Sequence, residues 1–382
     1  MTDKFISYSQ QHIDEEDIAS VVEVLRSDWL TTGPKISEFE EVVASYVGAR
    51  HAVAVSSGTA ALHCAMYALY IESGDEVIVP SITFAATANC VVYMGGKPVF
   101  ADVEAGTLLI DADDVERRIT KKTRAIIAVD YAGHPCDYDR LKEIAGRHSL
   151  FLVSDSCHAL GAEYQGKKCG TISDLSVFSF HPVKHITTGE GGMITTDNPE
   201  YAKRMRRFRN HGISADHARR KMQGTWYYEM VDLGFNYRIT DFQCALGISQ
   251  MAKLPRFLDR RQEIAALYDE AFDKMPGINP LDVSGNVNHA YHLYVIRVLE
   301  EECGRDRGQI FNALRDAEIS VNVHYIPVHL HPYYQERYAT KAGMCPVAER
   351  AYEEILSLPI HPSMTKADVD RVVSALEESM GP

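Results

Sequence analysis

The sequence predicts an α/β protein with a large domain around a mainly parallel sheet and a smaller α+β domain at the C-terminal end. From about residue 52 to residue 196, short apolar segments alternate with amphipathic ones. This alternation is typical of a parallel sheet with helices on both faces. The 382 residues also exceed one typical hydrophobic core. We therefore expect a large domain at residues 1–250 and a small domain at residues 251–382.

Each element of the large domain is expected from its hydrophobic spacing. Two amphipathic helices, Glu15–Arg26 and Ser37–Tyr46, come before the alternation. The expected strands are short apolar runs, namely Ala52–Val55, Glu76–Val79, Pro98–Ala101, Ala125–Val129, Phe151–Ser154 and Val177–Phe180. The helices between them include Ala85–Tyr93, Ala112–Ile119 and Asp139–Arg147.

The small domain is expected to follow a long linking helix at about Leu258–Met275. Beyond this helix, Tyr291–Val298 and Ser320–His324 read as strands, and Arg307–Ala317 reads as a helix. Strands and helices in this mixed order predict an α+β domain.

Composition and charge exclude several classes of function. The formal net charge of −14 argues against nucleic acid or an anionic membrane as a general partner. No run of about 18 apolar residues is present, so we expect no membrane span and a cytoplasmic location. The eight cysteines are scattered, and such spacing predicts neither a zinc site nor a disulfide framework.

The stretch Ser176–Gly192 carries the strongest chemical signal, with Lys184 at its centre. The β-rich run Val177–Phe180 leads into a turn, and Lys184 follows in a loop that is polar and glycine-rich further on. Most lysines are solvated surface residues, but a strand end fixes the direction of a side chain while the loop leaves it accessible. An accessible amine that is easily neutralised is suited to Schiff-base formation with an aldehyde.

Asp155 supplies a second group at the same edge of the sheet. It ends the apolar strand that begins at Phe151, and ligands of parallel sheets collect beyond the carboxyl ends of the strands. Asp155 and Lys184 are therefore expected to reach one crevice. A carboxylate for a pyridinium nitrogen and an amine for an aldehyde carbon are the pair that pyridoxal 5′-phosphate (PLP) requires. The residues 1–250 would then form the PLP-binding domain.

A phosphate site is expected where the strand Ala52–Val55 breaks into a helix. Ser57, Gly58 and Thr59 open this helix with free N–H groups and hydroxyls. Serine before a helix is more often a plain N-cap. Ser179 adds a further hydroxyl near Lys184, and this favours the phosphate interpretation.

Motifs along nearly the whole chain resemble one family, the sugar-nucleotide aminotransferases of the DegT/StrS group. The motifs that carry the resemblance are, in order, S-S-G-T-A-A-L-H, P-S-I-T-F-A-A-T-A-N, S-D-S-C-H-A-L-G, S-F-H-P-V-K-H-I-T-T-G-E-G-G, R-N-H-G-I and G-F-N-Y-R-I-T-D-F-Q-C-A. The resemblance implies a fold-type I PLP enzyme with an aspartate aminotransferase-like large domain. Within the group, the chain is most similar to the branch that aminates a C4 keto sugar for pseudaminic acid, through D-Y-A-G-H-P-C and the motifs around Asp155 and Lys184.

The resemblance implies a reaction. L-glutamate would give its amino group to the C4 keto group of a nucleotide-linked 4-keto-6-deoxy N-acetyl sugar, with UDP as the nucleotide, for the amino sugars of cell-surface polysaccharides. Lys184 would carry PLP and act as general acid and base.

The resemblance also assigns roles to further residues. Phe84, which pattern alone would place in the core, would stack on the PLP ring, and His158, equally a core candidate, would lie against the PLP 3-hydroxyl. Asn236 would reach across a homodimer interface to the phosphate of the partner's cofactor. The expected sugar-nucleotide contacts are Tyr8, Thr31, Thr32, Gly33, His324 and Tyr325. On pattern alone, the turn at Thr31–Gly33 would be a helix–helix connector.

Several alternatives stay open. One is another PLP reaction on a sugar nucleotide, such as amination at C3 or dehydration, although in a dehydratase branch of the family histidine takes the place of the lysine and Lys184 is kept here. A non-catalytic regulator with this fold is a further alternative, against which the intact Lys184, Asp155, Ser179 and Asn236 speak. The histidine-rich segment 324–331 lacks cysteine and carboxylate ligands, so we expect no metal there.

Overall fold

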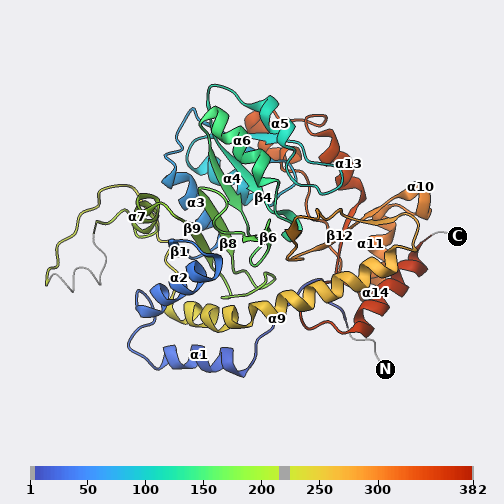
Figure 1. The fold of residues 1–382 in the computed structure, drawn as a ribbon, viewed down its shortest axis with the longest axis horizontal. Helices are drawn as coiled ribbons and strands as arrows, with labels where there is room; N and C mark the ends of the chain where they lie inside the picture. The colour runs from blue at the N-terminus through green and yellow to red at the C-terminus, as the bar shows by residue number, and fades with distance from the viewer. Residues whose placement is uncertain (1–4, 215–223, 381–382) are drawn as a thin grey trace.

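The computed structural model describes residues 5–214 and 224–380, and its centre is a seven-stranded sheet (Figure 1). The strands lie in the order β1 (His51–Val55), β9 (Gly192–Thr196), β8 (Leu175–Ser179), β5 (Phe151–Asp155), β4 (Thr123–Val129), β2 (Glu76–Pro80) and β3 (Lys97–Ala101). Neighbours from β8 to β3 pair in parallel, whereas β9 is antiparallel to both β8 and β1. The expected α/β class with a mainly parallel sheet is therefore confirmed.

The strands read as continuous apolar runs because the sheet is covered on both faces. Every residue of β2 and of β9 is buried. The six strands expected for this sheet match the observed ones to within two residues at each end, and β9 is an additional strand that was not predicted.

Helices pack along the sheet and on one another. Those of the large sheet are α2 (Pro34–Val47), α3 (Gly58–Ala68), α4 (Ala86–Tyr93), α5 (Ala112–Arg118), α6 (Tyr138–His148) and α7 (Pro199–Phe208), with a 3₁₀ turn at Tyr131–Gly133. Helix α3 packs against β8 and β9, α4 against β3, and α6 against β5. Within the described residues, no helix is both long and apolar enough to cross a membrane.

A long helix, α9 (Asp241–Phe272), runs under the large sheet and on to the C-terminal side of the molecule (Figure 1). Helix α1 (Glu15–Leu25) and α2 pack against it. The expected start at Leu258 was wrong, because the helix begins at Asp241 and continues through Pro255. Proline inside a helix costs about 3 kcal/mol, and the buried face of α9 outweighs this cost.

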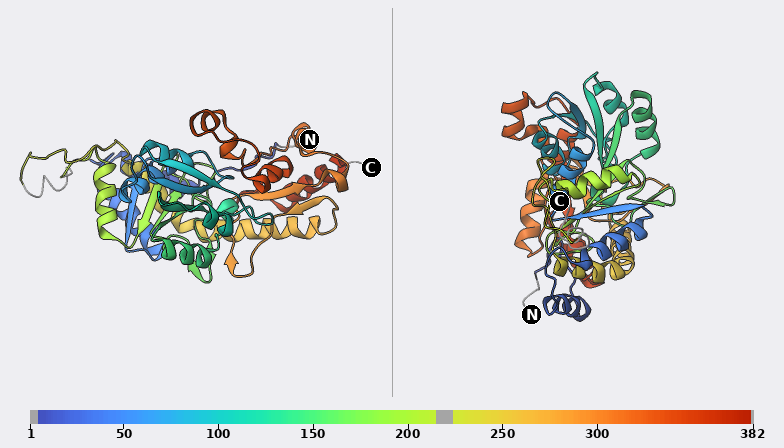
Figure 2. Two further views of the ribbon diagram at one scale, coloured as in Figure 1. Left: turned by 90° about the horizontal axis from the view of Figure 1, so that it is seen from above. Right: turned by 90° about the vertical axis from the view of Figure 1, so that its left-hand side faces the viewer.

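The C-terminal side is built around a second hydrophobic core. An antiparallel sheet of β10 (Ile278–Pro280), β12 (Tyr294–Val298) and β13 (Ile355–Leu358) packs with α10 (Glu300–Cys303), α11 (Arg307–Asp316) and α14 (Lys366–Ser379). The view from above shows these elements beside the large sheet (Figure 2, left). The proposed domain boundary at residue 250 stays a prediction.

Part of the C-terminal chain returns to the large core. This part contains a 3₁₀ turn (Val328–Leu330), α12 (Pro332–Tyr338) and α13 (Pro346–Glu354). The expected strand Ser320–His324 was wrong, because only Asn322 pairs there, in an isolated bridge with Ser357. Asn322 exchanges backbone hydrogen bonds with Ser357 of β13 at 3.2 and 2.8 Å, and further on the Val328 N–H donates to the Ser81 carbonyl, just after β2, at 2.8 Å. A third sheet, also of three strands, joins β6 (Glu163–Tyr164), β7 (Lys167–Lys168) and β11 (Val287–Asn288).

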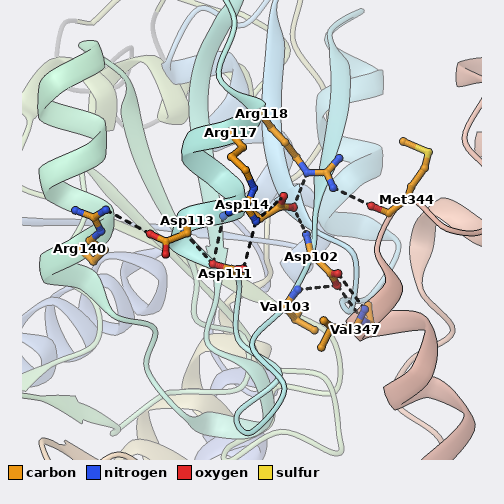
Figure 3. A network of polar contacts seen from close by, with 11 residues as sticks. Asp102, Val103, Asp111, Asp113, Asp114, Arg117, Arg118, Arg140, Met344 and Val347 are labelled. Atoms are coloured by element: carbon orange, nitrogen blue, oxygen red, sulfur yellow. Dashed lines mark hydrogen bonds and ion pairs between the residues drawn. The ribbon is translucent and has the colours of Figure 1, made fainter.

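A buried carboxylate, Asp102, joins the end of β3 to the start of α13 (Figure 3). Its oxygens accept hydrogen bonds from the backbone N–H groups of Val347 at 3.0 Å and Ala348 at 2.9 Å. Asp114 accepts from the Asp102 N–H at 2.7 Å and pairs with Arg118. The network therefore fixes α13, and with it the returning C-terminal chain, against the large sheet.

Replacing Asp102 with alanine should lower the free energy of unfolding by about 2 kcal/mol, because two helix-start N–H groups lose their acceptor. Urea denaturation of the purified protein measures the change. Asp113→Ala is the matched control, since Asp113 is exposed and its pair with Arg140 is a surface one. Surface pairs contribute about 0–1 kcal/mol, so an equal loss in both variants would contradict the assignment.

Candidate active site

A cleft of about 530 Å³ lies at the carboxyl ends of the parallel strands. Residues at or just after the ends of β1, β2, β4, β5 and β8 line this cleft. Ligands of parallel sheets collect at this edge. Segment 322–325 closes the cleft from the C-terminal side. The predicted residues that line it are Tyr8, Ser57, Gly58, Thr59, Phe84, Asp155, His158, Ser179, Lys184, His324 and Tyr325.

Lys184 presents its amine to this cleft from the loop after β8. Its Nζ lies 3.3 Å from Nε2 of His292. Burial lowers the pKa of the Lys184 amine below its usual range; Cys157 and Asp155 act against this change, whereas Arg261 reinforces it. A larger share of the amine is therefore neutral, and only a neutral amine is nucleophilic.

Asp155 is a buried carboxylate at the end of β5, held by two donors. Its Oδ2 accepts the Thr87 hydroxyl at 2.7 Å, and its Oδ1 accepts the Cys157 N–H at 3.3 Å. The Thr87 hydroxyl also lies 2.8 Å from that of Thr83. The carboxylate is therefore fixed in direction, which suits it to holding a proton on a ring nitrogen.

The start of α3 lies beside Ser179 in the same cleft. Ser57 is the N-cap of α3 and accepts the Ala60 N–H at 3.0 Å. The N–H groups of Gly58 and Thr59 in the first turn have no intrahelical acceptor. A Cβ at Gly58 would lie 2.9 Å from the Ser179 Cβ, so only glycine leaves this cradle open. The arrangement suits a phosphate group.

Aromatic and imidazole side chains form the remaining wall. His158 Nε2 lies 3.2 Å from the Tyr325 hydroxyl, and the Phe84 ring, which is 60% exposed, lies 6.0 Å from the Tyr325 ring. The Tyr8 ring lies 5.7 Å from that of His324. Burial lowers the pKa of His158 well below its usual range and that of His324 to about 4. Both imidazoles are therefore neutral near pH 7.

The structure does not bring every predicted residue into the cleft. Thr31 and Gly33 lie in the turn between α1 and α2, which contacts the start of α9. There Thr31 forms a bridge with Thr240, and the Gly33 N–H donates to the Asp241 carboxylate at 2.8 Å. Thr32 is exposed in the same turn. Within one chain this turn is the helix–helix connector that its pattern suggested. Asn236 is exposed and does not line the cleft of its own chain.

Three functional candidates escaped the sequence analysis. Thr87 lies four residues after Thr83 on α4, and His292 and Arg261 reach the lysine region from the C-terminal side. Thr87 lies within the motif P-S-I-T-F-A-A-T-A-N but was assigned no role there, and no local motif marks His292 or Arg261. In the histidine-rich segment, His329 lies 2.9 Å from Glu349, and no group of three or more metal-ligating side chains occurs among residues 5–214 and 224–380.

Comparison with known proteins identifies the family of the chain. A profile of the DegT/DnrJ/EryC1/StrS aminotransferase family matches residues 11–377. The chain belongs to this family. DegT-family relatives include the UDP-4-amino-4-deoxy-L-arabinose–oxoglutarate aminotransferase of Shewanella sediminis, which is 38% identical over 387 residues and covers 100% of both chains.

Two solved DegT-family structures resemble this one over 98% of its length. Spr1654 from Streptococcus pneumoniae, described as a sugar aminotransferase, is 35% identical with a TM-score of 0.92 in its pyridoxamine phosphate (PMP) form and 98% of its chain covered. It is also known in a PLP form. Helicobacter pylori PseC, an aminotransferase involved in the biosynthesis of pseudoaminic acid, is 34% identical with a TM-score of 0.91 and 99% of its chain covered. This DegT-family chain is therefore a sugar aminotransferase that uses PLP.

The residues of the cleft fit PLP. Lys184 offers an amine for the aldehyde, Asp155 a fixed carboxylate for the ring nitrogen, and the start of α3 a cradle for the phosphate. We propose that these three elements hold the cofactor.

Replacing Gly58 with alanine should weaken PLP binding to the cofactor-free protein by about tenfold, because overpacking costs about 1–3 kcal/mol. Titration of the visible absorption of bound PLP measures the dissociation constant. Gly146→Ala in α6 is the control, since a Cβ there meets no atom within 4 Å. An unchanged dissociation constant of PLP in Gly58→Ala would contradict the placement of the phosphate at the start of α3.

Proposed function

We propose that the protein moves an amino group from L-glutamate to the C4 keto group of a UDP-linked 4-keto-6-deoxy N-acetyl sugar. The observation that carries the transamination is the Lys184 amine, made less basic by burial, in one cleft with Asp155 and the start of α3. The product would be an amino sugar for pseudaminic acid-type biosynthesis at the cell surface.

The chain's own groups divide the work of this reaction. PLP, when bound, supplies a ring that accepts the electron pair left on carbon when a proton is removed. Asp155 holds a proton on the ring nitrogen. Lys184 Nζ takes a proton from the α-carbon of glutamate in the first half of the cycle and delivers one to C4 of the sugar in the second half. His158 and Tyr325 wall the cleft around these groups.

Two relatives support the choice of substrate. The Shewanella relative is named for a UDP-linked 4-amino sugar with oxoglutarate as its partner, and oxoglutarate is the keto acid that glutamate leaves behind. PseC is named for pseudoaminic acid biosynthesis. Amination at C4 of a UDP sugar is the reaction we infer from these two names. Dehydration has less support, because Lys184 lies in the cleft as the amine that amino transfer needs.

We also propose that the enzyme is a homodimer in which Asn236 reaches the cofactor phosphate of the partner. The described part of the chain between α7 and α9 projects from the body (Figure 1), and Asn236 forms an isolated bridge with Asn210 near the end of α7. The projecting part exposes large apolar side chains, of which Trp226 is 84%, Leu233 71% and Met230 68% exposed. Such a surface is typical of a protein interface. In a dimer, Thr31, Thr32 and Gly33 would border the partner's cleft. Sedimentation as a monomer at micromolar concentration would contradict this arrangement.

The substrate is tested by product analysis. The PLP-loaded enzyme is incubated with ¹⁵N-glutamate and, in parallel, with UDP-linked 4-keto-6-deoxy and 3-keto N-acetyl sugars. Mass spectrometry and NMR should find ¹⁵N on C4 of the first sugar and no product from the second. Amination at C3, or loss of a hydroxyl without nitrogen incorporation, would contradict the proposal.

A further inference from the structure

The His292 side chain contacts the Lys184 amine. It lies in the short segment before β12, and its Nε2 is 3.3 Å from Lys184 Nζ. The two residues are 108 positions apart in the chain. His292 is 2% exposed and lines the same cleft as Lys184. The contact therefore lies inside the cleft, and no sequence motif predicted it.

The backbone of His292 is held by a buried arginine. Arg261 of α9 is 1% exposed, and its Nη1 donates to the carbonyl oxygens of Tyr291 at 3.0 Å, His292 at 3.3 Å and Ile360 at 3.0 Å. Three carbonyl acceptors on one guanidinium nitrogen tie α9 to the segment before β12. These hydrogen bonds fix the backbone that carries the His292 imidazole. Positioning of a catalytic group requires such a fixed backbone.

The surroundings keep His292 neutral. Burial lowers its pKa well below the usual range, and the positive charges of Lys184 and Arg261 add to the effect. The ionisable groups around the pair are Asp155, Cys157, His158, His185, Arg261 and His324. A neutral imidazole offers one unprotonated nitrogen. The His292 Nδ1 is buried with no hydrogen-bond partner. The ring nitrogen that contacts Lys184 is therefore Nε2.

We propose that His292 is a positioning residue for Lys184, whose Nε2 accepts a hydrogen bond from the lysine amine and holds it at the cleft wall whenever the amine is not bonded to the cofactor. A lysine released by the amino donor has many rotamers to explore. With His292 as its resting partner, the amine stays within reach of the carbon whose proton it moves. This inference rests on the proposed role of Lys184 as the catalytic lysine.

The test measures the Lys184 amine directly in the cofactor-free protein. An amine-reactive ester labels the protein across a pH series, and mass spectrometry follows the peptide that contains Lys184. A neutral acceptor favours the charged ammonium, so His292→Leu should move the midpoint of labelling to lower pH by about one unit. His292→Gln keeps an acceptor near the position of Nε2 and should restore most of the shift.

The control is another buried histidine of the same segment. His289 accepts the Tyr291 N–H at 2.8 Å on Nδ1, and no interaction between it and Lys184 is resolved. His289→Leu should leave the midpoint unchanged. In the PLP-loaded enzyme, His292→Leu should lower kcat by about 10- to 100-fold with the KM for glutamate nearly unchanged.

Two results would overturn the inference. One is an unchanged midpoint of Lys184 labelling in His292→Leu. The other is an equal shift of this midpoint in His289→Leu, which would show that loss of any histidine from the segment has the same effect. Either failure is distinguishable from failure of the proposed function, because Lys184→Ala would then still be inactive.

Discussion

Lys184→Ala should reduce turnover by at least about four orders of magnitude, because one side chain supplies both the link to PLP and the general acid and base. The steady-state rate of oxoglutarate formation from glutamate measures the loss. The fold should be retained, since the amine packs in the cleft rather than in either hydrophobic core.

Two comparisons make the Lys184 result specific. The variant should still bind PMP, because the phosphate cradle and Asp155 do not depend on the amine. Lys167→Ala, which removes an exposed lysine of β7, should keep full turnover. Ordinary turnover in Lys184→Ala would contradict the site assignment altogether.

Asp155→Asn should lower kcat by about 10²- to 10³-fold, which is the effect of removing one preorganised electrostatic group from an active site. The asparagine oxygen still accepts the Thr87 hydroxyl, which lies 2.7 Å from Oδ2 in the native protein. The shape of the side chain and this contact are kept, whereas the acceptor for the Cys157 N–H and the negative charge that would hold a proton on the ring nitrogen are lost. Stopped-flow measurement of the half-reaction with glutamate isolates this step.

A graded variant separates charge from orientation at Asp155. Thr87→Val removes only the hydroxyl that directs the carboxylate and should cost about tenfold, the value of one hydrogen bond to a charged group. Equal losses in Thr87→Val and Asp155→Asn would show that orientation rather than charge matters. Full activity in Asp155→Asn would contradict its assignment to the ring nitrogen.

Several of the predicted residues that the structure brings into the cleft stand at or just after strand ends. Asp155 and Ser179 end β5 and β8, and Ser57 caps the helix after β1. A parallel sheet brings such ends to one edge whatever lies between them. The order of apolar strands in the sequence was therefore sufficient to place Asp155, Ser57 and Lys184 together.

The positions that were missed depend on packing between distant segments. The Thr87 hydroxyl reaches Asp155 from 68 residues away, and His292 reaches Lys184 from 108. Arg261 is fully buried on α9, although arginine on a helix usually reads as a solvated residue. The spacing of residues within a short stretch of sequence does not predict such long-range contacts. The length of α9 was missed for a related reason, since tertiary packing overrides the effect of Pro255.

The roles of Asn236 and of the turn at Thr31–Gly33 lie outside a single chain. Both are surface features of the protomer described here. Only a second copy would bring them to a cleft, so they stay predictions of the dimer.

The absorption spectrum of the PLP-loaded protein tests most directly the claim that Lys184 carries PLP through an amino transfer. We predict that the visible band of lysine-bound PLP disappears on addition of L-glutamate, gives way to the near-ultraviolet band of PMP, and returns when a UDP-linked 4-keto-6-deoxy N-acetyl sugar is added. A visible band that forms with PLP but is unchanged by glutamate would contradict the transamination while leaving the cofactor site in place.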